Sequence, residues 1–299
     1  MKNGIWKYTE KLKYVKEQFR CSMGEGNTPI SKFLDTYIKR EDLNPTGSYK
    51  DRGVAYRISV ACQNGENKLV VTSTGNFAIS MATYGEKFGV QIIVFIPKTI
   101  SPEKEKLLNL TKAKVFKVDK PILQAKDYAK AHDIPYIRQS LDTNVLEGFK
   151  TLILEVLDNK IKFENIIFPA SSGSLMLASY QVLNELNVDK FPRLIAVQTC
   201  YNTYIAREFY KGYVKSLNPS LATSLNVKLR PEKLDQVIHA IKKTNGTAFV
   251  VNEKDIKNTN DLLWKNNIKV GYESAAGFFA AKKLNLKGNT LVISTGVKR

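Results

Sequence analysis

Residues 44–53 read Asn44-Pro45-Thr46-Gly47-Ser48-Tyr49-Lys50-Asp51-Arg52-Gly53 and set one lysine at the end of a turn. Pro45 and Gly47 mark a tight bend, and Ser48 is a good N-cap for a helix that begins at this point. A lysine at a helix start meets the positive end of the helix dipole, which disfavours the protonated amine. The neutral amine is the form that attacks an aldehyde. Taken alone, the stretch also fits a surface lysine in a turn, so other parts of the chain must decide.

The composition is that of a folded protein with one large domain or two domains of about 100–200 residues. The chain has 299 residues, of which 43% are hydrophobic and 25% charged. Apolar runs such as residues 90–96 are far shorter than the ~20 residues of a membrane span. Residues 1–7 carry charge with no apolar run behind them, so we expect a cytoplasmic protein without a signal peptide or a membrane partner. The three cysteines are far apart in sequence and predict neither a disulfide framework nor a metal site.

The charge of the chain raises the question of a nucleic-acid partner, because the formal net charge is +18. The basic residues are scattered, with no run of five or more and no nucleic-acid-binding motif. We therefore expect no nucleic-acid partner, and we expect attraction for small anionic molecules.

Apolar, β-branched runs alternate with amphipathic helical patterns along the chain. Strands are predicted at 68–73, 90–96, 114–118, 165–168, 194–198 and 289–294. Helices are predicted at 76–88, 102–110, 122–132, 146–159, 174–186, 231–243, 253–266 and 274–284. Such β-α units with nearly continuous apolar strands predict an α/β fold whose parallel sheets are flanked by helices on both faces.

Three loops at predicted strand ends are candidate binding sites, because ligands of parallel sheets bind at the carboxyl ends of the strands. Ser171-Ser172-Gly173-Ser174 has the outline of a phosphate cup at a helix start, although an ordinary serine-rich turn remains an alternative. Ser73-Thr74-Gly75-Asn76 has a similar position and would offer N–H groups to a carboxylate. Ser294-Thr295-Gly296 is the third loop.

Seven segments in order resemble the threonine synthase family, within the tryptophan-synthase-β-like, fold type II enzymes that use pyridoxal phosphate. The segments are Ser22–Ile30, Asn44–Gly53, Ser73–Asn76, Leu146–Thr151, Ser220–Ser224, Gly246–Ala248 and Ser294–Gly296. The resemblance implies a two-domain α/β enzyme that forms a homodimer. Residues 66–144 would form a small mobile domain, and residues 1–65 and 145–299 the large cofactor-binding domain.

The resemblance also implies a role for each loop. Lys50 would hold pyridoxal 5'-phosphate as a Schiff base and then act as acid and base. Asn76 would bond the ring hydroxyl, and Thr295 would face the pyridine nitrogen. A neutral hydroxyl at that nitrogen makes the ring a weaker electron sink, which suits elimination or replacement better than transamination. The cofactor phosphate would be held by Ser171, Ser172, Gly173 and Ser174, and the carboxylate of an amino-acid substrate by Ser73, Thr74, Gly75 and Asn76.

The implied reaction is that of a lyase that eliminates phosphate from O-phosphohomoserine and adds water to give threonine. Glu273 matches an acidic residue of the family, but Phe77 replaces a small hydroxyl residue and Val145 replaces an arginine expected at the substrate phosphate. Losing two charge-assisted hydrogen bonds of about 1.5–3 kcal/mol each would weaken phosphate binding by roughly two to four powers of ten. A serine or threonine ammonia-lyase and a non-catalytic, cofactor-binding paralogue therefore remain open alternatives.

Overall fold

The computed structural model describes residues 4–73, 75–188, 190–227 and 231–298, and the chain divides into two compact units. Unit 1 contains the described parts of Met1–Asn27 and Asn44–Leu152, and unit 2 those of Thr28–Leu43 and Ile153–Lys298. The predicted small domain, residues 66–144, lies inside unit 1. Its mobility and its boundaries stay predictions.

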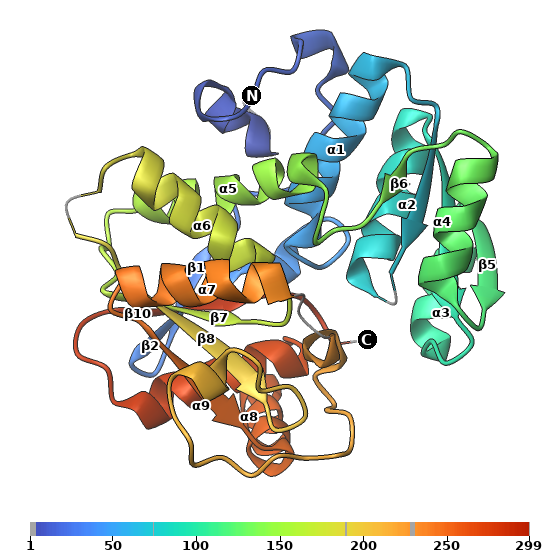
Figure 1. The fold of residues 1–299 in the computed structure, drawn as a ribbon. Coiled ribbons are helices and arrows are strands. Elements are labelled where there is room, and N and C mark those ends of the chain that lie inside the picture. The colour runs from blue at the N-terminus through green and yellow to red at the C-terminus, as the bar shows by residue number, and fades with distance from the viewer. Residues whose placement is uncertain (1–3, 74, 189, 228–230, 299) are drawn as a thin grey trace. The chain divides into compact units, whose positions relative to one another are not determined.

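Unit 1 is built on a four-stranded parallel sheet in the order β5-β4-β3-β6 (Figure 1). Its strands are β3 (Lys68–Thr72), β4 (Gln91–Pro97), β5 (Lys114–Val118) and β6 (Tyr136–Ile137), and helices α2 (Asn76–Phe88), α3 (Pro102–Asn109) and α4 (Pro121–Ala131) follow the first three. Ile93 of β4 packs on α4 through Ala125 and Ala129, whereas its neighbour Ile92 faces Gly85 of α2. Side chains alternate across a strand, so α2 and α4 cover opposite faces of this sheet.

Two longer helices, α1 (Lys50–Asn64) and α5 (Thr143–Leu157), meet at glycines that the sequence motifs contain. A Cβ at Gly53 would lie 2.6 Å from the carbonyl oxygen of Val145, and one at Gly148 would overlap the backbone of Arg52. The two helix backbones are therefore in direct contact, which a side chain at either position would prevent. The 3₁₀ helices η1 (Gly4–Lys11) and η2 (Glu17–Phe19) complete the described part of unit 1.

Unit 2 contains a six-stranded sheet in the order β1-β2-β10-β7-β8-β9. The strands are β1 (Ile30–Phe33), β2 (Thr36–Arg40), β7 (Asn165–Pro169), β8 (Arg193–Thr199), β9 (Thr247–Val251) and β10 (Thr290–Ser294). β1 and β2 form an antiparallel hairpin, and the other pairs are parallel. β2, β10 and β7 come from distant parts of the chain, yet they lie side by side (Figure 1).

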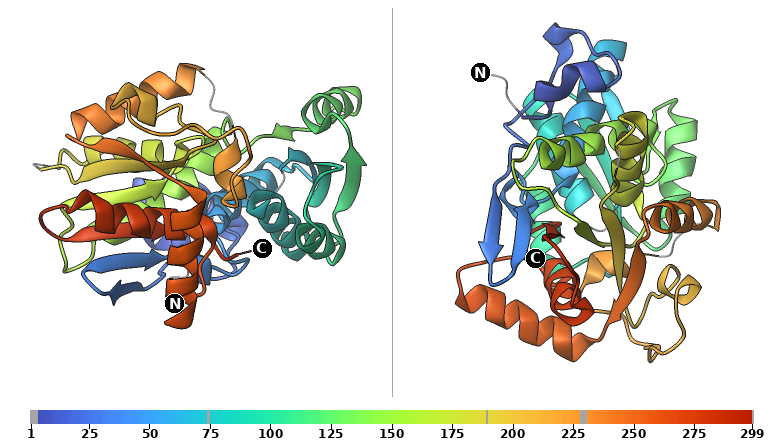
Figure 2. Two further views of the ribbon diagram at one scale, coloured as in Figure 1. Left: turned by 90° about the horizontal axis from the view of Figure 1, so that it is seen from below. Right: turned by 90° about the vertical axis from the view of Figure 1, so that its left-hand side faces the viewer.

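Helices cover both faces of the larger sheet. α8 (Glu253–Lys265) and α9 (Tyr272–Leu284) lie on one face, where Ile167, Ile195 and Val197 pack against Ala276 and Ala280. α6 (Ser174–Glu185) and α7 (Pro231–Lys243) lie on the other face, as Figures 1 and 2 show. The 3₁₀ helices in the described part of unit 2 are η3 (Glu41–Leu43), η4 (Ala206–Glu208) and η5 (Thr223–Asn226). The predicted α/β class with parallel sheets and flanking helices is confirmed. None of the helices in the described part of the chain is long and apolar enough to cross a bilayer.

Two of the three cysteines are closer together than their spacing in the sequence suggested. Cys21 and Cys62 lie with their Sγ atoms 3.7 Å apart, although both thiols are free. Burial, with the neighbouring Cys62 as the second cause, raises the pKa of the Cys21 thiol to about 12. Cys21 is therefore a protonated, poorly nucleophilic thiol at neutral pH.

A buried carboxyl group lies in the segment Ser22–Ile30. Glu25 is fully buried and accepts hydrogen bonds from the Met23 backbone N–H at 2.9 Å, from the Tyr84 hydroxyl at 2.8 Å and from Ser22 Oγ. Burial raises the pKa of Glu25 to about 7, because the charged form is desolvated and its hydrogen bonds only partly offset this cost.

This raised pKa makes the stability of the fold depend on pH. The unfolded side chain releases its proton near pH 4.5, so the stability gained from the protonated folded form is complete below that pH and is lost as pH rises towards 7. We expect Glu25→Gln to abolish this dependence. The melting temperature of the wild type minus that of the variant should therefore fall by ~2 °C or more between pH 5 and pH 8. Thermal unfolding at the two pH values measures it, with the exposed Glu10→Gln as the control. A constant difference between wild type and Glu25→Gln would contradict the assignment.

Candidate active site

The turn before α1 is held by Asp51. α1 begins at Lys50, as predicted, but its N-cap is Tyr49 and none of the described side chains caps it. The prediction that Ser48 caps this helix is wrong. Asp51, in the first turn, instead reaches back and accepts hydrogen bonds from the backbone N–H of Thr46 at 2.6 Å and from its hydroxyl. This carboxylate also accepts a bond of 2.6 Å from Ser80 Oγ, which joins the start of α1 to α2.

Ser48 has a different environment from that of a cap. Its side chain is fully buried, and its Oγ has no hydrogen-bond partner among the described residues. A buried hydroxyl without a partner is unfavourable unless a ligand or water satisfies it. This oxygen lies two residues before Lys50, so its environment fits a polar ligand beside the lysine.

The Lys50 amine lies against aromatic side chains of unit 1. Its Nζ donates a hydrogen bond to the Tyr49 hydroxyl, and it lies 3.9 Å from the centre of the Tyr49 ring and 5.7 Å from that of Phe149. Desolvation raises the pKa of Tyr49, although a hydrogen bond with Gln139 lowers it in part. The group beside the Lys50 amine is therefore a neutral phenol, whose oxygen accepts a hydrogen bond from Nζ without placing a negative charge there.

The loop after β3 leaves the start of α2 open to a ligand. Asn76 is the first residue of α2 and Gly75 its N-cap, without a capping side chain among the described residues. The Gly75 N–H donates to Ser73 Oγ at 3.3 Å, and a Cβ on Gly75 would meet only open space. Uncapped N–H groups at a helix start favour anions, which fits the predicted carboxylate site. Thr74, also predicted for this site, lies outside the described residues.

The predicted phosphate cup joins β7 to α6. Gly173, the N-cap of α6, has a φ of 65°, and a Cβ there would overlap the Val237 side chain, so both backbone and space require glycine. Ser172 Oγ and Ser174 Oγ are 3.0 Å apart. No described side chain caps α6. Together with Ser171, these residues form a loop of small side chains at the positive end of a helix, which fits a phosphate group.

Thr295 follows β10 at the same edge of the sheet as the cup, because β10 and β7 are parallel neighbours. Ser294, the last residue of β10, donates to Asp42 at 2.7 Å, and Arg40 forms an ion pair with Asp42 at 2.7 Å. Ser294 Oγ also lies 3.2 Å from Ser274 Oγ. This buried network fixes the backbone that carries Thr295.

Two residues that lie far apart in the sequence, Ser224 and Glu273, are in contact in unit 2. Glu273, at the start of α9, accepts hydrogen bonds from the backbone N–H of Ser224 at 3.0 Å and from its hydroxyl at 2.7 Å. The pair joins η5 to α9. Ser224 belongs to the segment Ser220–Ser224 that resembled the threonine synthases, and Glu273 matched an acidic residue of that family, but nothing local in the sequence predicted their contact.

The structure thus gathers the predicted site residues into two groups. Unit 1 carries Lys50 and Asn76, the first residues of two helices that Asp51 connects, and Ser73 and Gly75 in the loop before α2. Unit 2 carries the cup, Ser171–Ser174, and Thr295 at one sheet edge. The assignment of these residues to cofactor and substrate stays a prediction.

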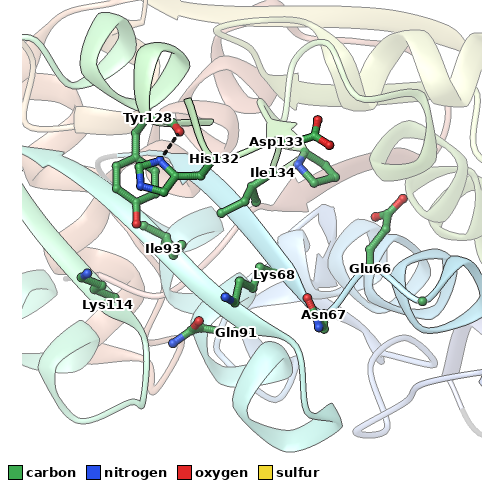
Figure 3. A pocket seen from close by; sticks show the side chains of 12 residues that line it. Glu66, Asn67, Lys68, Gln91, Ile93, Lys114, Tyr128, His132, Asp133 and Ile134 are labelled. Carbon is green, nitrogen blue, oxygen red and sulfur yellow. Dashed lines mark hydrogen bonds between the residues drawn. The ribbon is translucent and has the colours of Figure 1, made fainter. Parts of the chain in front are cut away.

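A cavity of about 650 Å³ opens at the amino ends of the unit 1 strands, opposite the edge that carries Ser73–Asn76 (Figure 3). It lies beside Lys68, Gln91 and Lys114, the first residues of β3, β4 and β5, and beside Tyr128 and His132. Ligands of parallel sheets bind at the opposite edge, and none of the predicted site residues that the structure describes lines this cavity. The cavity is therefore separate from the candidate site.

Comparison with known proteins identifies the family. The profile of the family described as "Pyridoxal-phosphate dependent enzyme" matches residues 21–296. The threonine synthase of Methanosarcina acetivorans is 28% identical over 306 residues, which cover 94% of this chain and 74% of that protein. The threonine synthase of Methanocaldococcus jannaschii is 28% identical over 310 residues, which cover 95% of this chain and 76% of that protein.

Solved structures share the fold. Maize serine racemase aligns with a TM-score of 0.79 at 18% identity, over 91% of this chain and 88% of the racemase. The serine racemase of Dictyostelium discoideum aligns with a TM-score of 0.75 at 21% identity, over 91% of this chain and 92% of that racemase. The expected family resemblance, the enzyme class and the cofactor are confirmed by the family and sequence matches. The chain belongs to the pyridoxal-phosphate dependent enzymes.

Proposed function

We propose that this enzyme is a lyase of the threonine synthase type, which eliminates phosphate from O-phosphohomoserine and adds water to give threonine. The observation that carries the proposal is the contact of Ser224 with Glu273, since it joins a segment that resembles a threonine synthase motif to a residue that matches an acidic residue of that family. The extent of the similarity to the two archaeal threonine synthases supports it, because the matches cover nearly the whole chain. A cytoplasmic homodimer stays a prediction.

Each predicted site residue has a separate role in this proposal. Pyridoxal phosphate, when bound, supplies the electron sink that stabilises negative charge at the substrate Cα. Lys50 would bind the cofactor covalently through Nζ, take the proton from the substrate Cα and return a proton later in the cycle. Asn76 would bond the ring hydroxyl, and Thr295 would face the ring nitrogen without a charge. The cup, Ser171–Ser174, would hold the cofactor phosphate, and the loop Ser73–Asn76 the substrate carboxylate.

The substrate phosphate needs ligands other than those the family suggested. Phe77 is 1% exposed in α2, and Val145 is 0% exposed where α5 meets α1, so neither side chain presents a polar group to a ligand. Arg138 directly follows β6, whose parallel pairing with β3 places it at the sheet edge of the loop Ser73–Asn76. Its neighbour Gln139 bonds the Tyr49 hydroxyl, next to Lys50. We assign the phosphate of the substrate to the Arg138 guanidinium, which suits a phosphate dianion.

The buried Phe77 and Val145 favour a second candidate, a serine or threonine ammonia-lyase, because that substrate has no distal phosphate to bind. A threonine deaminase is also among the solved structures that share the fold, with a TM-score of 0.77 at 19% identity. A cofactor-binding paralogue without turnover is the third candidate.

Product analysis separates the three. We expect release of inorganic phosphate from O-phosphohomoserine with equal formation of threonine, and little ammonia from serine or threonine. A phosphate assay, an ammonia assay and chromatography of the products measure these outcomes on the same preparation. Ammonia release alone would reject the threonine synthase assignment in favour of the ammonia-lyase, and a bound cofactor without any product would indicate the paralogue.

Lys50 is tested by two variants. Lys50→Ala and Lys50→Arg should each reduce turnover by roughly a thousandfold or more, because neither side chain can form the covalent bond, while arginine keeps the positive charge. Steady-state kinetics and the visible absorbance of the purified protein report the loss, and circular dichroism checks the fold. Turnover by either variant near the wild-type rate would refute the role of Lys50.

The role of Arg138 in binding the substrate phosphate is tested by the KM for O-phosphohomoserine. Arg138→Gln should raise the KM for O-phosphohomoserine by roughly 10–100-fold, as expected for the loss of a charge-assisted hydrogen bond. Arg207→Gln removes an exposed guanidinium elsewhere and should leave the KM within twofold. An unchanged KM in Arg138→Gln would show that other groups bind the substrate phosphate.

A further inference from the structure

Helix α7 packs directly over the candidate phosphate cup within unit 2. A Cβ on Gly173 would overlap Val237 of α7, so at this point the loop backbone and the helix are in van der Waals contact. Lys233 lies one helical turn before Val237, and residues four apart lie on the same face of a helix. The face of α7 that covers the cup therefore carries a lysine.

The Lys233 ammonium is directed at the start of α6. Its Nζ donates a hydrogen bond to Ser174 Oγ at 3.3 Å, and Ser174 is 2% exposed. Ser174 Oγ in turn lies 3.0 Å from Ser172 Oγ. Two hydroxyl groups and one ammonium group are thus joined at the positive end of α6, where an anion is favoured. A lysine in this place adds a full charge to the neutral hydroxyl donors of Ser172 and Ser174.

We propose that Lys233 is a ligand of the cofactor phosphate. The inference rests on the proposed role of Ser171–Ser174 and adds to it the group that neutralises the phosphate charge. The side chains of the cup itself, Ser171, Ser172 and Ser174, carry hydroxyl groups and no charge. An ammonium within reach of Ser174 supplies a charge-assisted hydrogen bond, which is roughly twice as strong as one between neutral groups.

This role predicts a preference that depends on the phosphate alone. Pyridoxal has the ring and the aldehyde of the cofactor but lacks the phosphate group. Removing Lys233 should therefore weaken the binding of pyridoxal 5'-phosphate and leave that of pyridoxal unchanged. A lysine that merely stabilises the packing of α7 would affect both compounds equally.

The experiment titrates the full-length apoenzyme, prepared from the holoenzyme, with pyridoxal 5'-phosphate and with pyridoxal, and follows absorbance. Lys233→Ala removes the charge, Lys233→Arg keeps it, and Lys243→Ala removes an exposed lysine of the same helix as the matched control. We expect Lys233→Ala to raise the Kd for pyridoxal 5'-phosphate by about 10–100-fold and that for pyridoxal by less than twofold. Lys233→Arg should stay within about fivefold of the wild type for both compounds, and Lys243→Ala within twofold.

The remaining outcomes each have one meaning. An unchanged Kd for pyridoxal 5'-phosphate in Lys233→Ala overturns the inference, and so does an equal loss for both compounds, which would indicate a structural role. A folded Lys233→Arg variant as weak as Lys233→Ala would also contradict it. If wild-type protein binds pyridoxal 5'-phosphate no more tightly than pyridoxal, the assignment of Ser171–Ser174 to the cofactor phosphate is wrong. The role of Lys233 is then wrong as well. Such a result would leave Lys50 as a separate question.

Discussion

The arrangement around Lys50 depends on the buried carboxylate of Asp51. This side chain is 0% exposed and binds the backbone and hydroxyl of Thr46 as well as the hydroxyl of Ser80. A buried carboxylate is costly unless it is hydrogen-bonded, so these contacts are strongly favoured over alternative loop conformations. They hold the turn before α1 and connect it to α2, whose first residue is Asn76. One charge thus positions the two residues of unit 1 that we assign to the cofactor.

In unit 2, the predicted site residues are held by close packing and by a chain of polar contacts. The backbone at the cup is fixed by close packing, since Gly173 leaves no room for a side chain beside Val237. The strand end before Thr295 is fixed by the chain of contacts from Arg40 through Asp42 to Ser294. The side chains of the cup are small and neutral, and a charged group reaches it from another helix, since Lys233 Nζ lies 3.3 Å from Ser174 Oγ.

The sequence predicted the helices and the buried strands well, because their signals are local. The limits of α2, β5 and α7 agree with the predicted ranges, and for the two helices a glycine or proline marks the boundary, since α2 lies between Gly75 and Gly89 and α7 begins at Pro231. Strands β1, β2, β6 and β9 were missed. The hairpin strands β1 and β2 are short and partly exposed, β6 has two residues, and β2 finds its partner β10 more than 200 residues away. The same limit applies to the site. Motifs predicted Lys50 and Ser171–Ser174 as site residues, but the pairing of Ser224 with Glu273 and the approach of Lys233 to Ser174 arise from tertiary packing, which no local pattern encodes.

The central claim is that the Lys50 amine carries the cofactor. Borohydride reduction of the holoenzyme, followed by proteolysis and mass spectrometry, tests it directly because reduction makes the attachment permanent. We predict a single modified peptide, with the added mass of the reduced cofactor on Lys50. Modification of a different lysine, or an unmodified Lys50 peptide from fully loaded enzyme, would contradict the account.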